Sequence, residues 1–288
     1  MTEYHILSLG AGVQSTALYL LSMRGELGVP KFDFVIFADT QEEPEAVYRH
    51  LEWLQSLGGP KINIRSVGRL GDDLKKGRPR STEGENTGVA SIPVFTKELD
   101  GDVGKSKRQC TKEYKTEVVE RFIRREVLKL APKKRIPKDV IVHQYIGMSA
   151  DETGRMIRVK ARIEENSWQR PHFPLWENNW HRQYVRDWLK DKVPHETPRS
   201  ACVFCPYKRD SEWRRLRDTD PVGWARAIEI DNALRAEAFA AARMKSQLYL
   251  HRSCIPLAEA PINEIDDGQQ ELAWQHPMAA ECEGMCGL

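Results

Sequence analysis

The stretch HILSLGAGVQSTALYLLSM, residues 5–23, decides the fold. Its apolar run ends at Leu9, and Gly10-Ala11-Gly12 follows at once. Residues 15–23 then show helical spacing, with an expected buried side made of Ala17, Leu18, Leu20 and Leu21. We therefore predict a strand over 5–9, a glycine turn, and a helix over 15–23.

The same order of elements recurs downstream. Residues 34–38 are typical of a second buried strand, residues 44–57 of a helix that opens with acidic side chains, and residues 62–65 of an alternating third strand. Because parallel strands need crossover connections, these units predict an α/β fold with a doubly wound, Rossmann-like parallel sheet. Further along we expect a strand over 140–146 and helices over 113–130, 181–191, 211–217 and 223–245.

Residues 70–106 break this pattern, because Gly, Asp, Lys, Arg, Ser and Thr dominate there. We interpret the segment as a substrate-facing loop. Two regions are expected: an α/β domain over residues 1–195, and a helical region over residues 196–288 that carries five of the six cysteines.

Composition describes an ordinary globular chain. The 288 residues are 40% hydrophobic and 30% charged, and 44 basic against 42 acidic residues give a net charge of +2. This balance argues against a globally basic nucleic-acid coat but allows a local basic patch. No apolar run is long enough to span a membrane and no secretory signal is visible, so we expect a cytoplasmic protein without a membrane partner.

The first candidate site is the glycine turn, Ser8 to Ser15. Its glycines let backbone N–H groups approach an anion, and the start of the following helix adds partial positive charge. It lacks the third glycine of a dinucleotide fingerprint and the Gly-Lys-Ser/Thr of a Walker A loop. The alternative is a tight strand-to-helix turn without a ligand.

The second candidate is Asp39-Thr40, at the end of the second strand. Ligands of open α/β sheets lie outside the carboxyl ends of the strands, so this pair is expected at the same crevice, facing a nucleobase or ribose. The alternative is a helix cap, since Asp and Thr are favoured at that position.

The third candidate is the set of cysteines. Cys202 and Cys205 form a C-x-x-C pair, a spacing that suits one metal or cluster and also a redox pair. Cys110 lies among cations that would stabilise a thiolate, whereas Cys254 is interpreted as a packing residue. Cys282 and Cys286, in a glycine-bearing tail, are interpreted as a late ligand or a nucleophile, with a frayed end as the alternative.

Together these motifs resemble the phosphoadenosine phosphosulfate (PAPS) reductase family, in the iron–sulfur branch of the PP-loop adenine-nucleotide (alpha hydrolase) superfamily. The resemblance runs from residue 4 to about residue 210. The motifs that carry it, in chain order, are Gly12 and Ser15 of the turn; Asp39-Thr40 with Pro44-Glu45; Arg108-Gln109-Cys110 with Lys115; Gly147 with Asp151, Glu152 and Arg155; Pro174-Leu175 with Trp188; and Cys202-x-x-Cys205. The chain differs from the family in having Gln109-Cys110 where the iron–sulfur reductases have two cysteines, and in lacking a histidine after Cys282.

The resemblance implies a HUP-type fold and a division of roles. The phosphates of an adenine nucleotide, ATP or PAPS/APS with Mg²⁺ as a compatible ion, would bind the turn (Ser8, Gly10, Ala11, Gly12, Val13, Gln14, Ser15), with Asp39 and Thr40 toward the adenosine and Gly147, Arg108, Lys115 and Arg155 completing the site. A 4Fe-4S cluster would be held by Cys110, Cys202 and Cys205, with Cys286 as the expected fourth ligand and Cys254, Cys282 or an open iron as alternatives. Zinc is the alternative metal, and Cys282 or Cys286 would be the catalytic thiol.

Three functions follow from the resemblance. The first is nucleotide-dependent sulfur transfer assisted by the cluster, onto an acceptor that includes nucleic acid or a nucleobase. The second is a PAPS/APS reductase that releases sulfite, and the third is a metal-stabilised nucleotide-binding module without turnover. The implied partners are an adenine nucleotide, a sulfur donor or thiol reductant, and a nucleic-acid substrate, and the enzyme is compatible with a homodimer.

Overall fold

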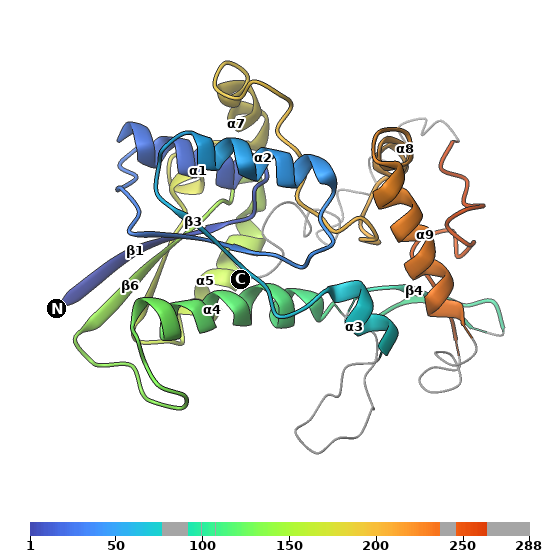
Figure 1. Cartoon of the computed structure of the whole chain (residues 1–288), viewed down its shortest axis with the longest axis horizontal. Helices are drawn as coiled ribbons and strands as arrows, with labels where there is room; N and C mark the ends of the chain where they lie inside the picture. Colours follow the sequence, from blue (N-terminus) through green and yellow to red (C-terminus); the bar gives the residue numbers. More distant parts are fainter. Residues whose placement is uncertain (77–91, 99, 107, 237–245, 264–288) are drawn as a thin grey trace.

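A five-stranded parallel sheet organises the molecule (Figure 1). The structure is a computed structural model that describes residues 1–76, 92–98, 100–106, 108–236 and 246–263. The strand order is β3-β2-β1-β6-β7, and every neighbouring pair is parallel. The strands are β1 (Thr2–Leu9), β2 (Phe34–Ala38), β3 (Ile62–Arg65), β6 (Val140–Ile146) and β7 (Gln169–His172). The predicted Rossmann-like α/β fold is confirmed.

Helices cover both faces of this sheet (Figure 1). On one face lie α1 (Val13–Arg24), α2 (Glu45–Ser56), α6 (Pro174–Glu177) and α7 (Arg182–Leu189), packed in one hydrophobic core. On the other lie the helix formed by η1 (Lys112–Thr116), α4 (Glu117–Phe122) and η2 (Ile123–Val127), and α5 (Thr153–Glu164), which follows the short η3 (Ala150–Glu152). Apolar side chains are therefore buried on both sides of β1 and β2, which is why β2 and the second half of β1 are mostly apolar.

A separate hydrophobic core lies beside the sheet. It contains α8 (Asp210–Thr219), α9 (Pro221–Arg235) and β8 (Gln247–Tyr249), together with α3 (Leu70–Lys76). A small antiparallel sheet of order β5-β4-β8 joins β4 (Phe95–Lys97) and β5 (Val103–Lys105) to this region. The C-terminal region thus shares its core with residues from the 70–106 segment.

Two sequence predictions are wrong in detail. Residues 70–106 are not one irregular loop, because α3, β4 and β5 lie within them; residues 77–91, 99 and 107 are outside the described part of the chain. The helix predicted to reach Lys245 ends at Arg235, where Ala236 takes an extended conformation with φ −61° and ψ 140°. None of the helices within the described ranges is long and apolar enough to cross a membrane.

Candidate functional site

The glycine turn connects β1 directly to α1. Ala11 takes the left-handed conformation, with φ 55°, whereas Gly12 has φ −104°. The Ser15 hydroxyl lies inside the turn, where it accepts from the Gly10 N–H at 3.1 Å and donates to the Gly12 carbonyl at 3.2 Å. Its hydroxyl is therefore engaged in holding the turn, and the contribution of this turn to an anion would come from backbone N–H groups.

The start of α1 has no neutralising group of its own. No side chain of the described residues caps it, and its first turn contains no acidic residue. Gln14, Ser15 and the rest of the turn from Ser8 are buried, and the Ser8 hydroxyl accepts from Gln144 Nε2 at 3.0 Å. The uncapped N–H groups and the helix dipole leave partial positive charge at this point.

The segment after β6 packs against this turn. A Cβ placed on Gly147 would lie 2.6 Å from the Ser15 nitrogen and 2.8 Å from the Gln14 carbonyl carbon, so a residue with a side chain does not fit there. Beyond it, the Glu152 carboxylate accepts from Gln14 Nε2 at 3.1 Å and from the Ser149 N–H at 3.2 Å. The motif of Gly147 and Glu152 that the sequence analysis named therefore lies at the glycine turn.

Arg155 is buried in this contact and does not face solvent. Its Nη1 forms an ion pair with Glu152 at 2.5 Å, and the side chain is 8% exposed. Its Nη2 is buried and has no hydrogen-bond partner among the described residues. Asp151 accepts from the Arg182 N–H at 2.6 Å and from His181 at 2.8 Å; although burial raises the pKa of Asp151, these bonds leave it lowered overall.

Asp39 and Thr40 lie at the carboxyl end of β2, as predicted. The Asp39 carboxylate accepts from the Gln41 N–H at 2.7 Å and from the Tyr48 hydroxyl at 3.0 Å, and burial raises its pKa. Neither residue caps α2, whose cap position is Pro44. The helix-cap interpretation of this pair is therefore wrong.

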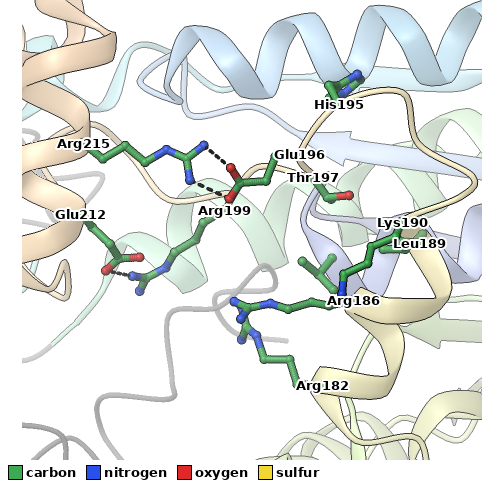
Figure 2. A pocket seen from close by; sticks show the side chains of 11 residues that line it. Arg182, Arg186, Leu189, Lys190, His195, Glu196, Thr197, Arg199, Glu212 and Arg215 are labelled. Atoms are coloured by element: carbon green, nitrogen blue, oxygen red, sulfur yellow. Dashed lines mark hydrogen bonds and ion pairs between the residues drawn. The ribbon is translucent and has the colours of Figure 1, made fainter. Parts of the chain in front are cut away.

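A cavity of about 330 Å³ adjoins the start of α1 (Figure 2). Val13, the first residue of α1, lines it together with basic side chains of α7 and of the segment that follows: Arg182, Arg186, Lys190 and Arg199. The cavity also contains two carboxylates, each paired with a cation. Glu196 makes a bidentate ion pair with Arg215, at 2.7 and 2.8 Å, and Glu212 pairs with Arg199.

The surroundings in this cavity lower the pKa of one of its own basic side chains. Burial and, next, the charge of Arg186 lower the pKa of Arg182 to about 10. An anion in the cavity would relieve both the repulsion among the guanidinium groups and the cost of their burial. The sequence prediction missed this cluster, although the i, i+4 spacing of Arg182 and Arg186 on a predicted helix places both on one face.

The predicted ligand cysteines come together from distant segments. Cys202 Sγ lies 3.1 Å from Thr40 Oγ1, and the Cys205 N–H donates to the Cys202 carbonyl at 2.9 Å. Burial, and next the Glu43 carboxylate, raise the pKa of Cys202 well above its ordinary value, with Cys110 as a further contributor. Lys115 acts in the opposite direction and forms an ion pair with buried Glu43 at 3.3 Å.

These thiols suit a thiophilic centre by their chemistry. Burial keeps Cys202 as a thiol, so a nearby positive centre would be needed to hold it as the thiolate ligand. As the side chains stand, no group of three His, Cys, Asp or Glu residues in the described ranges is arranged to hold a metal ion. Cys282 and Cys286 lie outside the described residues.

Two further predicted residues, Arg108 and Cys254, have contacts outside the cavity. The Arg108 guanidinium carbon lies 5.9 Å from the centroid of the Tyr207 ring, and Tyr207 follows Cys205 by two positions in the sequence. Cys254 is buried, with its Sγ 4.0 Å from the Thr96 carbonyl, in the region of the small sheet.

Comparison with protein-family models, with curated proteins and with solved structures finds no match.

Proposed function

We propose that this chain is a PAPS reductase-like PP-loop enzyme with the HUP-type form of the fold. It binds an adenine nucleotide, ATP or an adenylated sulfur compound, and carries out sulfur transfer with the help of an iron–sulfur cluster. The observation that carries the proposal is the cationic cavity at the uncapped start of α1, where Val13 lies beside Arg182, Arg186 and Arg199.

The anionic part of the nucleotide would bind in this cavity. Backbone N–H groups of the turn and the dipole of α1 favour an oxyanion, and arginine side chains suit bidentate contact with phosphate or sulfate oxygens. Asp39 and Thr40, at the carboxyl end of the neighbouring strand, remain the proposed contacts of the adenosine, since ligands of open α/β sheets lie along this edge. Arg155 acts indirectly, because its ion pair with Glu152 holds the turn.

The thiols would lie at the same edge of the sheet, because Cys202 contacts Thr40. We propose Cys110, Cys202 and Cys205 as cluster ligands and Cys286 as the fourth, with Cys282 or Cys286 as the catalytic thiol. The cluster would supply electrons or a sulfur site beside the bound nucleotide. We further propose a cytoplasmic location, since free cysteines persist in a reducing compartment.

Nucleotide binding is tested by calorimetric titration of ATP, PAPS and adenosine phosphosulfate. Gly12→Val should abolish binding without unfolding the chain, because φ −104° at Gly12 is open to a β-branched residue. Arg186→Ala should weaken binding roughly tenfold or more, the usual effect of losing a charged hydrogen bond. Arg121→Ala, on the exposed surface of α4, is the matched control. Unchanged affinity in both site variants would contradict the proposal.

The reaction and the cluster have separate measurements. Pyrophosphate release from ATP supports sulfur transfer, whereas sulfite release from PAPS indicates a reductase, and binding without either indicates a module without turnover. Anaerobic purification followed by iron and sulfide analysis tests the cluster. Alanine at Cys110, Cys202 or Cys205 should remove the visible absorbance, and a colourless protein with one zinc would contradict the iron assignment.

A further inference from the structure

A chain of hydrogen bonds runs from the glycine-turn helix to the cationic cavity. Thr16 Oγ1 lies 2.8 Å from His50 Nε2, and His50 Nδ1 lies 2.8 Å from His195 Nε2. Thr16 belongs to α1, His50 belongs to α2 and is fully buried, and His195 is exposed and lines the cavity. His195 is therefore the end of this chain that a ligand can reach.

His50 is the fixed member. Burial and, next, the neighbouring His195 lower the pKa of His50 to about 3, so this imidazole is neutral at physiological pH. A neutral imidazole has one N–H group and one acceptor nitrogen. When Thr16 donates to Nε2, His50 donates its Nδ1–H to His195; when His50 donates to Thr16, its Nδ1 accepts a hydrogen bond from the Nε2–H of His195.

The second arrangement allows His195 to be an imidazolium. His195 then donates Nε2–H to His50 and keeps Nδ1–H for another partner. The Trp53 ring, also from α2, packs against His195 in a T-shaped contact with 5.4 Å between the ring centroids. The buried acceptor thus supports a charged His195 without placing a second charge beside it.

Several charged side chains line the cavity together with His195. Arg182 and Arg186 of α7, and Lys190 directly after this helix, line the same cavity as His195. The carboxylates Glu196 and Glu212, from the adjoining segment and α8, are already paired with Arg215 and Arg199. A bound dianion would place negative charge beside His195 and favour the imidazolium, because an opposite charge stabilises the charged form.

We propose that His195 takes up a proton when an oxyanion binds the cavity and contacts that oxyanion as an imidazolium, with His50 as the positioning residue that fixes its tautomer. This inference rests on the proposed function of the cavity as an anion site. It adds proton-coupled recognition: binding of the phosphate or sulfate group would weaken as the pH rises, because fewer protons are then available for His195 to take up.

Sulfate is the suitable probe, because it remains a dianion between pH 6 and pH 8 and contributes no titration of its own. Calorimetry in two buffers that differ in heat of ionisation gives the number of protons taken up. The wild-type protein should take up a sizeable fraction of one proton near pH 7, and its affinity should fall roughly tenfold between pH 6 and pH 8. His195→Gln should abolish the uptake and flatten the pH profile.

Two further variants separate positioning from folding. His50→Gln, checked for folding by circular dichroism, should reduce the proton uptake while sulfate still binds. His143→Gln makes the same exchange on β6, away from the cavity, and should retain the wild-type uptake.

The outcomes distinguish this inference from the proposed function. Sulfate binding that Arg186→Ala weakens, but that takes up no proton or takes up the same number in His195→Gln, overturns the role of His195 and leaves the anion site intact. Absence of sulfate binding to the wild-type protein overturns both.

Discussion

The helix starts that follow β1 and β6 lie in contact, yet they differ in how their positive ends are treated. At η3, which leads into α5, Glu152 forms a capping box with Ser149 and supplies a carboxylate from within the chain. At α1 no side chain of the described residues caps the end, and the cationic cavity lies beside it. Since the N-terminus of a helix favours negative charge, α1 is where an anion from outside would be stabilised.

The start of α2 extends this comparison. Its first N–H, that of Glu45, donates to the Asp220 carboxylate at 3.1 Å, and the same carboxylate accepts from Gly223 at the start of α9, at 2.8 Å. One buried aspartate therefore serves two helices. The starts after β2 and β6 each receive a carboxylate from the protein, which sharpens the contrast with α1.

The largest effect is expected from Glu152→Gln. This change leaves Arg155 buried without its ion pair, and breaking a buried pair costs about 3–5 kcal/mol. Urea unfolding measures the loss. Glu164→Gln on the exposed side of α5, where the carboxylate is 3.9 Å from Lys160, should change stability by less than about 0.5 kcal/mol. Equal stability of the two variants would show that the Glu152 carboxylate does not stabilise the start of η3.

Val13→Glu tests the comparison from the other side. A glutamate at the first position of α1 would supply the missing carboxylate and pair with the cavity arginines. Nucleotide affinity should then fall by more than about a hundredfold, since like charges placed together in a site cost several kcal/mol. Val13→Gln has a similar size without the charge. If both variants bound nucleotide equally well, the phosphates would not lie at the start of α1.

Gly147→Ala probes the contact between the two turns. The added Cβ would meet the backbone of Gln14 and Ser15 within 3.0 Å, and backbone atoms of a packed turn cannot move aside cheaply. We expect a loss of about 1–3 kcal/mol in unfolding free energy, the usual cost of overpacking, together with weaker nucleotide binding. Gly154→Ala in α5, whose Cβ would have its nearest contact at 3.9 Å, should be neutral or stabilising.

The sequence predicted those parts of the molecule whose pattern is local. Strands β2, β3 and β6 have the predicted bounds, and the turn and Gly147 meet because adjacent parallel strands end at one edge. β7 escaped prediction because its sequence, Gln169–His172, is polar and contains Pro171, which is typical of an edge strand. α5 was missed although Met156, Val159 and Ile163 recur at helical spacing on its buried side.

The cavity could not be predicted in the same way. Its members come from α1, α7, the segment around Arg199, and α8, and no local pattern links these segments. Only the i, i+4 pair on α7 is visible as a unit in the sequence. Two of the cations form ion pairs with carboxylates: Arg155 with Glu152, and Arg199 with Glu212. Both ion pairs depend on tertiary packing.

The smallest effect is expected from Asp220→Asn, which weakens the capping of α2 and α9 together. An asparagine keeps one acceptor oxygen, so one of the two N–H groups loses its partner, at a cost of about 1 kcal/mol. Thermal unfolding measures the change, and Asp218→Asn, whose carboxylate is exposed beside Arg217, is the control. Because Asp220 serves α2 and not α1, nucleotide affinity should stay at the wild-type value. A loss of affinity as large as that of Val13→Glu would mean that the anion binds at α2, and the contrast between the helix starts would have to be redrawn.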